Sequence, residues 1–178
     1  MTLEELKYPI GLANIPEQIT KKNIENWISD IERFPQELEF LVRELSENQL
    51  ETPYREDGWT IRQVIHHSYD SHHNSYTRFK WTLTEDKPVI KAYFEEIWAE
   101  LHDSKSGPIL LTIDALKGLH AKWVYFLRGL TESELNKSFI HPSGNEEVTL
   151  KENIGIYAWH CQHHYAQIEQ LMIRKGWK

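Results

Sequence analysis

Residues 149–176 read TLKENIGIYAWHCQHHYAQIEQLMIRKG, and this stretch carries both a strong helical signal and reactive side chains. Its first four residues, Thr149-Leu-Lys-Glu152, form a capping box, in which two side chains satisfy backbone N–H groups at a helix start. Apolar residues then recur every three or four positions, which predicts an amphipathic helix that ends near Gly176. His160 and His164 are four residues apart, so their side chains lie on one face of this helix, roughly 6 Å apart at Cβ.

Three other segments have the same helical periodicity. Residues 20–45 form the first, and Pro35 is expected to kink it. Residues 60–84 form the second, which opens with a capping box at Thr60-Ile-Arg-Gln63, and residues 108–130 form the third. Four amphipathic helices of roughly 20 to 27 residues, each about 30 to 40 Å long, predict an all-α protein with the architecture of a four-helix bundle.

The connections between these helices are unusually long for a bundle. Residues 46–58 and 88–107 exceed the usual two to eight residues, so we expect them to hold short extra helices or to cover one end of the bundle. Residues 139–148 contain a Pro-Ser-Gly-Asn turn between extended-looking ends, which predicts a small hairpin. The sequence has no internal repeat and no flexible linker, which favours a single domain over residues 1–178.

The composition limits the partners that the chain is expected to have. It holds 27 Asp and Glu against 20 Lys and Arg, and this acidic balance argues against binding to nucleic acid. No apolar run reaches the length of about 20 residues that spans a bilayer, and the first residues lack the pattern of a signal peptide. Cys161 is the only cysteine, so there is no disulfide framework. We therefore expect a cytoplasmic protein with no membrane or nucleic-acid partner.

Helical wheels indicate which histidines face the interior. His160 and His164 share the inward half of the last helix, and His67 lies beside the apolar stripe of segment 60–84, in line with Ser71, Asn74 and Arg78. Three imidazoles from two helices would form an open metal site, which is typical of a catalytic metal because structural zinc usually has four protein ligands. The His-x-x-x-His spacing also occurs in core or surface pairs that bind no metal, so that alternative stays open.

Two histidines next to these positions are interpreted differently. His163 points toward the other edge of its helix, away from His160 and His164. His66 falls on the far side of its helix and is expected to be exposed to solvent. The residues that share that side with His66 are Arg62, His73 and Lys80.

Three buried positions have structural interpretations. His72 lies inside an apolar stripe, where a hydrogen-bonded core histidine or a dimer contact is expected. His120 lies at the centre of the apolar face of segment 108–130, and four roles are open for it: a core hydrogen-bonding group, a residue that hydrogen-bonds to a metal ligand, an extra metal ligand, or a substrate contact. Cys161 does not face its neighbour His160, so we interpret it as a small buried filler rather than a nucleophile.

Two blocks of sequence, DGWTIRQVIHH at residues 57–67 and YAWHCQHH at residues 157–164, resemble the DinB superfamily. Together with TPYR, RFK and LTED, they resemble its YfiT branch over nearly the full length. The resemblance implies a homodimeric four-helix bundle that is a metal-dependent hydrolase, with zinc or nickel bound by His67, His160 and His164. Some relatives are S-transferases that use bacillithiol or mycothiol. Ser68 stands where the family more often has Leu, and it is expected to widen or polarise the pocket floor without touching the metal ligands.

Two classes of function follow. The first is a metal-dependent enzyme acting on a small molecule, in which one divalent ion, zinc first and nickel second, lowers the pKa of a water or of a thiol such as bacillithiol. Arg78 is a candidate to hold a substrate carboxylate, although pairing with acids on the helix surface is an equal alternative. The second class is a non-catalytic metal-binding bundle that acts through a partner. The candidates for substrate binding are Asn74, Arg78, His120 and Tyr157.

Overall fold

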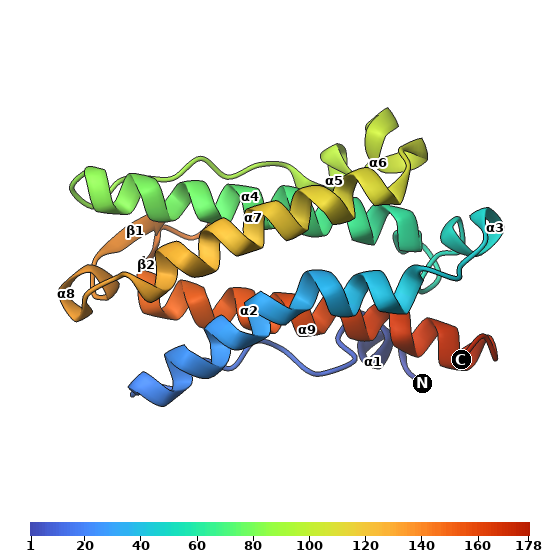
Figure 1. The fold of residues 1–178 in the computed structure, drawn as a ribbon, viewed down its shortest axis with the longest axis horizontal. Helices are drawn as coiled ribbons and strands as arrows, with labels where there is room; N and C mark the ends of the chain where they lie inside the picture. The colour runs from blue at the N-terminus through green and yellow to red at the C-terminus, as the bar shows by residue number, and fades with distance from the viewer.

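The structure, a computed structural model, describes residues 1–178, in which four long helices run side by side (Figure 1). The side chains of Thr60 and Thr149 each accept a hydrogen bond from a backbone N–H in the first turn of the helix that follows, as the capping boxes predict, and Thr20 does the same without having been predicted to. The helix after Thr20 continues through Pro35 and ends three residues before the predicted Leu45. The long helices are α2 (Lys21–Val42), α4 (Ile61–Thr84), α7 (Ile109–Arg128) and α9 (Leu150–Arg174).

The four helices form a ring in which α2 and α4 each contact both α7 and α9. Figure 1 shows that α2 and α9 run in one direction, whereas α4 and α7 both run in the other. Because α4 and α7 are parallel neighbours, the chain must return along the bundle between them, and residues 85–108 form this crossover. The length of this connection therefore follows from the order of the helices in space.

Short elements occupy the connections, as the sequence predicts. The α3 helix (Glu47–Leu50) lies in the first long connection, and α5 (Glu95–Trp98) and α6 (His102–Ser106) lie in the crossover. The predicted hairpin is present as antiparallel strands β1 and β2, with Phe139 opposite Val148, and Gly144 and Asn145 adopt positive φ at its tip. The remaining elements are α1 (Leu3–Lys7), α8 (Glu132–Leu135), β1 (Ser138–His141) and β2 (Glu146–Thr149).

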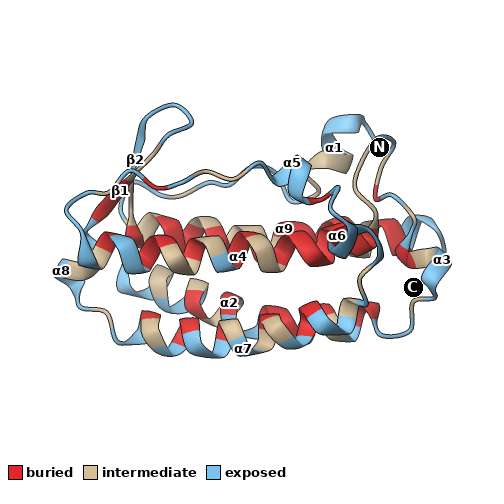
Figure 2. Cartoon of the chain, turned by 90° about the horizontal axis from the view of Figure 1, so that it is seen from above, coloured by how far each residue is buried: buried red, intermediate tan, exposed pale blue.

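The core fills the space between the inner faces of the long helices (Figure 2). Trp123 is fully buried and packs edge-on against Phe79, with ring centroids 5.8 Å apart. Between α4 and α9 the interior is polar, and Asn153 donates a hydrogen bond to Ser75 there. A polar strip inside an otherwise apolar bundle is where a functional site is expected, since buried polar groups destabilise the fold unless something satisfies them.

The N-terminal segment packs along α9 in the opposite direction. Gln167 donates a hydrogen bond to the carbonyl of Lys7, and the Trp159 indole donates to the carbonyl of Gly11. Further along, a Cβ atom at Gly155 would lie 2.8 Å from Cδ1 of Ile15 and 3.0 Å from the Trp27 ring, so glycine lets both side chains pack against α9 without shifting. This packing covers a face of α9 that helical periodicity alone would leave open.

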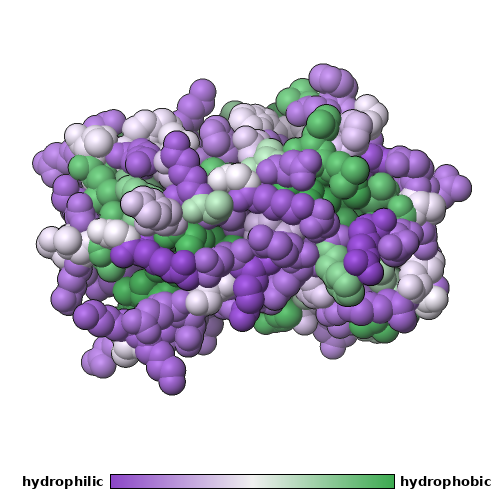
Figure 3. Space-filling view, viewed as in Figure 1, coloured by the Kyte–Doolittle hydropathy of each residue, from purple (hydrophilic) through white to green (hydrophobic).

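The molecular surface in the view of Figure 3 is mostly hydrophilic, with scattered apolar areas. None of the helices has the combination of length and apolarity that crossing a membrane requires.

Candidate metal centre

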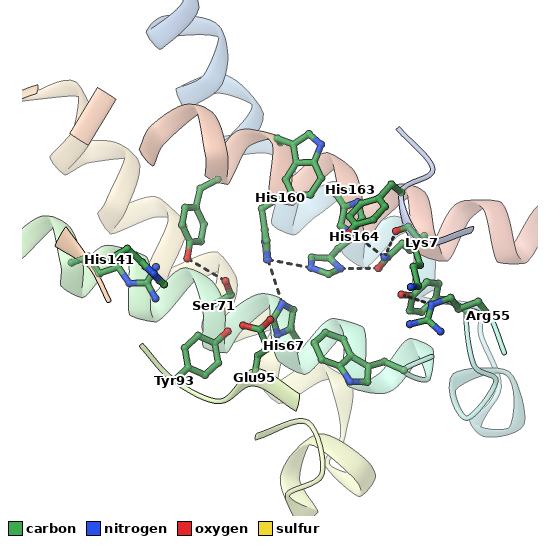
Figure 4. A pocket seen from close by; sticks show the side chains of 17 residues that line it. Lys7, Arg55, His67, Ser71, Tyr93, Glu95, His141, His160, His163 and His164 are labelled. Atoms are coloured by element: carbon green, nitrogen blue, oxygen red, sulfur yellow. Dashed lines mark hydrogen bonds between the residues drawn. The ribbon is translucent and has the colours of Figure 1, made fainter. Parts of the chain in front are cut away.

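Three imidazoles meet between α4 and α9 (Figure 4). Nε2 of His160 is 3.1 Å from Nε2 of His164 and 3.3 Å from Nε2 of His67. One ring nitrogen from each of these residues lies within 4.8 Å of the other two. His160 and His164 come from successive turns of α9, and His67 faces them from α4. The structure thus brings together the three residues that the helical wheels and the resemblance selected; we call them the three-histidine cluster.

A chain of buried hydrogen bonds fixes the orientation of His160. The carbonyl of Ile31 can only accept, so Nδ1 of His120 donates to it over 2.5 Å. Nε2 of a neutral His120 then accepts from Nδ1 of His72 at 2.7 Å, and Nε2 of His72 accepts from Nδ1 of His160 at 2.9 Å. The chain therefore leaves Nε2 of His160 without a proton, and its lone pair faces the cluster. We call this series the His72–His120 relay.

Gln167 fixes His164 in the same way. Its amide nitrogen donates to the carbonyl of Lys7 at 3.0 Å and to Nε2 of His163 at 2.9 Å. The amide oxygen must then accept, and it does so from Nδ1 of His164 at 2.9 Å. Nε2 of His164 is left with a lone pair that also faces the cluster.

Burial keeps these imidazoles neutral. It lowers the pKa of His67 to about 3 and that of His120 to about 4, and it lowers the pKa of His72, His160 and His164 well below the ordinary value, because a charged ring loses its hydration. The neighbouring imidazoles lower the pKa of His160 further. Two unprotonated nitrogens thus face each other across 3.1 Å, and the ring nitrogen next to them is Nε2 of His67, 3.3 Å from His160.

This arrangement predicts that the metal-free protein loses stability in acid. The unfolded chain binds protons on histidine at a pKa near 6.5, whereas folded His120 does so only near 4, so stability falls as the pH drops through that window. His120 alone should lower the free energy of unfolding by about 2 kcal/mol between pH 7 and pH 5. Urea unfolding at the two pH values measures this; equal or greater stability at pH 5 would contradict it.

The three-histidine cluster lines a cavity of about 460 Å³ (Figure 4). In the view of Figure 4, Lys7 and Arg55 lie on one side of the cluster, and His141 lies on the other. The Trp59 ring packs on His67, with centroids 4.5 Å apart. The lining residues are Lys7, Tyr8, Tyr54, Arg55, Trp59, His67, Ser71, Arg78, Tyr93, Glu95, His141, Tyr157, Trp159, His160, His163, His164 and Gln167.

Two of the four predicted substrate contacts line the cavity, and the other two do not. Arg78 and Tyr157 line the cavity, and the Tyr157 hydroxyl is 3.3 Å from Oγ of Ser71. Asn74 does not line it, because its side chain turns back to donate to the carbonyl of Asp70 at 2.8 Å. His120 lies in the core, where only 1% of it is exposed, and reaches the cavity only through the relay.

The predicted exposure of His66 is wrong. Its Nε2 donates to the carbonyl of Gly107 and its Nδ1 accepts from the Thr112 hydroxyl, at 3.2 and 2.6 Å. Arg62, expected on the same exposed side, is also buried, and it pairs with Glu47 and Glu51. The wheel assumed that α4 has one buried face, but the crossover and α7 cover a second one. His73 and Lys80 are exposed, as predicted.

His163 needs a similar correction. Its side chain is buried and lines the cavity, stacked on the Trp159 ring with centroids 4.5 Å apart. It was expected to point away from His160 and His164, but its ring centroid lies 4.9 Å from that of His164. The N-terminal segment brings Lys7 and Tyr8 over that edge of α9 and closes a cavity wall there. His163 is not one of the three clustered residues, but the prediction that it faces away from the site is wrong, because the N-terminal segment makes that edge of α9 part of the cavity.

His72, Cys161 and Ser68 were each given a role from the sequence. His72 is a fully buried hydrogen-bonding residue, as predicted. Cys161 is a buried free thiol, and burial raises its pKa well above the ordinary value, which fits a filler rather than a nucleophile. The effect predicted for Ser68 is wrong, because its hydroxyl donates to the carbonyl of Val64 and it does not line the cavity.

Several cavity residues were missed from the sequence. Trp59 precedes α4, Tyr93 and Glu95 belong to the crossover, and His141 lies in β1. Glu95 is the only carboxylate in the lining, and burial raises its pKa. No periodic pattern marks these positions. The only signal was the unusual length of the connections, which indicated a cover without identifying the residues that face inward.

Comparison with known proteins gives consistent matches. A family model described as the DinB superfamily matches residues 30–168. The "Putative metal-dependent hydrolase YfiT" of Bacillus subtilis (strain 168) is 44% identical over 177 residues, covering 99% of each chain. A "Putative metal-dependent hydrolase" of Bacillus cereus (strain AH820) is 47% identical over 175 residues, covering 98% of this chain and 100% of the relative.

A solved structure has the same architecture. It is that of YfiT from Bacillus subtilis, described as "a probable metal-dependent hydrolase with an unusual four-helix bundle topology". It matches with a TM-score of 0.96 at 44% identity, covering 98% of this chain and 99% of that one. The parallel pairing of α4 with α7 is therefore shared by a related protein of known structure.

Proposed function

This chain belongs to the DinB superfamily, and we propose that it is a metal-dependent enzyme, a hydrolase of the YfiT type that acts on a small molecule. His67, His160 and His164 would hold one divalent ion, with zinc expected first and nickel second, since imidazole suits both. When bound, such an ion supplies Lewis-acid chemistry and lowers the pKa of a coordinated water or thiol.

The observation that carries the proposal is the pair of lone pairs 3.1 Å apart on His160 and His164. Two hydrogen-bonded neighbours hold the ring protons on the opposite nitrogens, so a cation is the partner that relieves the repulsion between these atoms. In tetrahedral zinc sites with bonds of about 2.0–2.1 Å, neighbouring ligand nitrogens are about 3.4 Å apart. The spacings of 3.1 and 3.3 Å from His160 to the other two ligand nitrogens are close to that value, and all three nitrogens lie within 4.8 Å of one another.

The absence of a fourth protein ligand favours a catalytic ion over a structural one. The group holds three histidines and no carboxylate or thiolate, and the cavity opens in front of it. The rings of Trp59 and Trp159 form apolar walls that limit access of water. Glu95, as the only carboxylate of the lining, is our candidate for accepting the proton that the reaction releases.

Two assays test the proposal. The protein, purified without a histidine tag, should contain close to one zinc or nickel per chain by elemental analysis. It should then hydrolyse some members of a panel of small esters and amides without added thiol, and removal of the metal by a chelator should abolish that activity. Turnover of electrophiles that requires bacillithiol would instead support the S-transferase alternative. Protein that binds no metal would contradict both.

The homodimer implied by the resemblance stays a prediction. Large apolar side chains on α2 and α7 are exposed, including Phe40 at 67% and Tyr125 at 85%, and a second copy would shield such groups from water. Light scattering coupled to gel filtration measures the mass directly. A mass of one chain at micromolar concentration would contradict the dimer.

A further inference from the structure

Arg78 is a buried cation without a partner. Only 8% of the residue is exposed, and it lines the cavity. Its Nε is buried with no hydrogen-bond partner, and the guanidinium takes part in no ion pair of the chain. Burying an unpaired charge is costly, so arginines in such places normally have a carboxylate next to them. The protein supplies none within ion-pairing distance of Arg78.

Two other buried or cavity-lining cations of the protein do have hydrogen-bond partners. Arg62 is also buried, but it is satisfied by Glu47, Glu51 and the carbonyl of Gly107. Arg55, which also lines the cavity, donates to the Tyr54 hydroxyl and to the carbonyl of Glu56. Lys7, the third cation of the lining, also has no ion pair, but it is only half-buried. Arg78 is therefore the one cation of the cavity that is buried without a charged partner.

A second unsatisfied donor belongs to the same cavity. The hydroxyl of Tyr93 is buried and makes no hydrogen bond of normal geometry, although the Ser71 hydroxyl lies near enough that, against the larger effect of burial, it lowers the pKa of Tyr93 slightly. Burial and the neighbouring Tyr157 raise its pKa, so it remains a neutral O–H donor. In Figure 4, Tyr93 lies between His141 and His67. Arg78 lies about three turns beyond His67 on α4, and α4 packs against β1, which carries His141, so Arg78 is at the His141 side of the cavity. Burial first, and then the charge of Arg78, lowers the pKa of His141, which agrees with this placement.

We propose that the His141 side of the cavity binds an anionic oxygen group of the substrate, a carboxylate or a phosphate, with Arg78 as its ionic partner and Tyr93 as an additional donor. The planar fork of arginine matches two oxygens of either group. Three cations line the cavity against one carboxylate, in a chain of net charge −7, and this local excess also favours an anion.

The anion subsite depends on Arg78 and Tyr93, but the place where the substrate reacts rests on the proposed function, which assigns it to the three-histidine cluster. His67 and Arg78 are eleven residues apart on α4, so their Cα atoms are separated by about 16 Å along the helix. Both side chains reach into the same cavity, and Ser71 lies between them. The substrate would therefore be a molecule with its reactive group at the three-histidine cluster and its anionic group several bonds away.

The test is binding of inorganic phosphate and of succinate to the metal-free protein, measured by calorimetry. Removing the metal first ensures that an anion bound to the ion is not mistaken for one bound to Arg78. Arg78→Gln should weaken the binding of at least one of the two probes by about tenfold or more. Arg55→Gln, the matched control on the other side of the cavity, should leave it within about twofold. The probe that binds more tightly identifies the class of anion.

Thermal melting supplies an independent readout. Because Arg78 is an unpaired buried charge, Arg78→Gln should melt at the same temperature as the wild type or higher when no anion is present, and it should lose the rise in melting temperature that the anion causes. Three results would overturn the proposal: no saturable binding to the wild type, unchanged binding to Arg78→Gln, or equal losses in both variants. Metal content is measured separately, so failure of the metal site and failure of the anion subsite are distinguishable.

Discussion

His160→Ala is expected to release the metal and to abolish turnover. His160 is the central member of the three-histidine cluster, since its Nε2 is the atom within 3.3 Å of both other ligand nitrogens. Removing a residue that hydrogen-bonds to a metal ligand typically lowers metal affinity about 10- to 100-fold. Removing the ligand itself should lower the affinity by more than about 100-fold. Activity should fall in proportion to the metal lost.

His163→Ala is the matched control for this variant. His163 lies on the same helix, is buried and lines the same cavity, but it is not one of the three clustered ligands. Elemental analysis after gel filtration in a weak chelator should find metal in His163→Ala and almost none in His160→Ala. If both variants retain the wild-type amount, the metal is bound elsewhere and the proposed site is wrong.

His120→Phe is expected to weaken metal binding from outside the cavity. The substitution breaks the relay, so the carbonyl of Ile31 and Nδ1 of His72 lose their partner and nothing holds His72 in the tautomer that accepts from His160. Metal affinity should fall about 10- to 100-fold. Leaving buried polar groups unsatisfied should also lower the free energy of unfolding by about 1–3 kcal/mol.

The two effects are measured separately, by competition with a chelator for the metal and by urea unfolding of the metal-free protein. His120→Gln offers a side chain with both a donor and an acceptor, so it should recover part of the metal affinity. His73→Phe, on the exposed side of α4, should change neither quantity. A His120→Phe protein that is less stable but binds metal as tightly as the wild type would reduce the relay to a structural role.

The helices could be predicted because their signals are local. Capping boxes at Thr60 and Thr149 set two helix starts correctly, and periodicity identified the apolar faces. The three-histidine cluster was accessible for the same reason, since a four-residue spacing fixes the relative positions of His160 and His164. The order of the helices in the ring could not be obtained this way, because it depends on contacts between distant segments.

The residues whose positions could not be predicted are those that distant segments of the chain bury. His66 was assigned to solvent because the contacts that bury it come from Gly107 and Thr112, more than forty residues away. Tyr93 and Glu95 acquire their roles only because the crossover folds over the cavity. The relay was recognisable in part: His120 was placed in the core, but its link to His160 through His72 needs the packing of three helices on one another.

X-ray absorption spectroscopy at the edge of the bound metal tests the central claim most directly. We predict a first shell of nitrogen and oxygen only, with the multiple-scattering signature of three imidazoles at about 2.0–2.1 Å for zinc, and at least one further ligand that does not come from the protein. A sulfur ligand, four imidazoles, or fewer than three would contradict the open site formed by His67, His160 and His164.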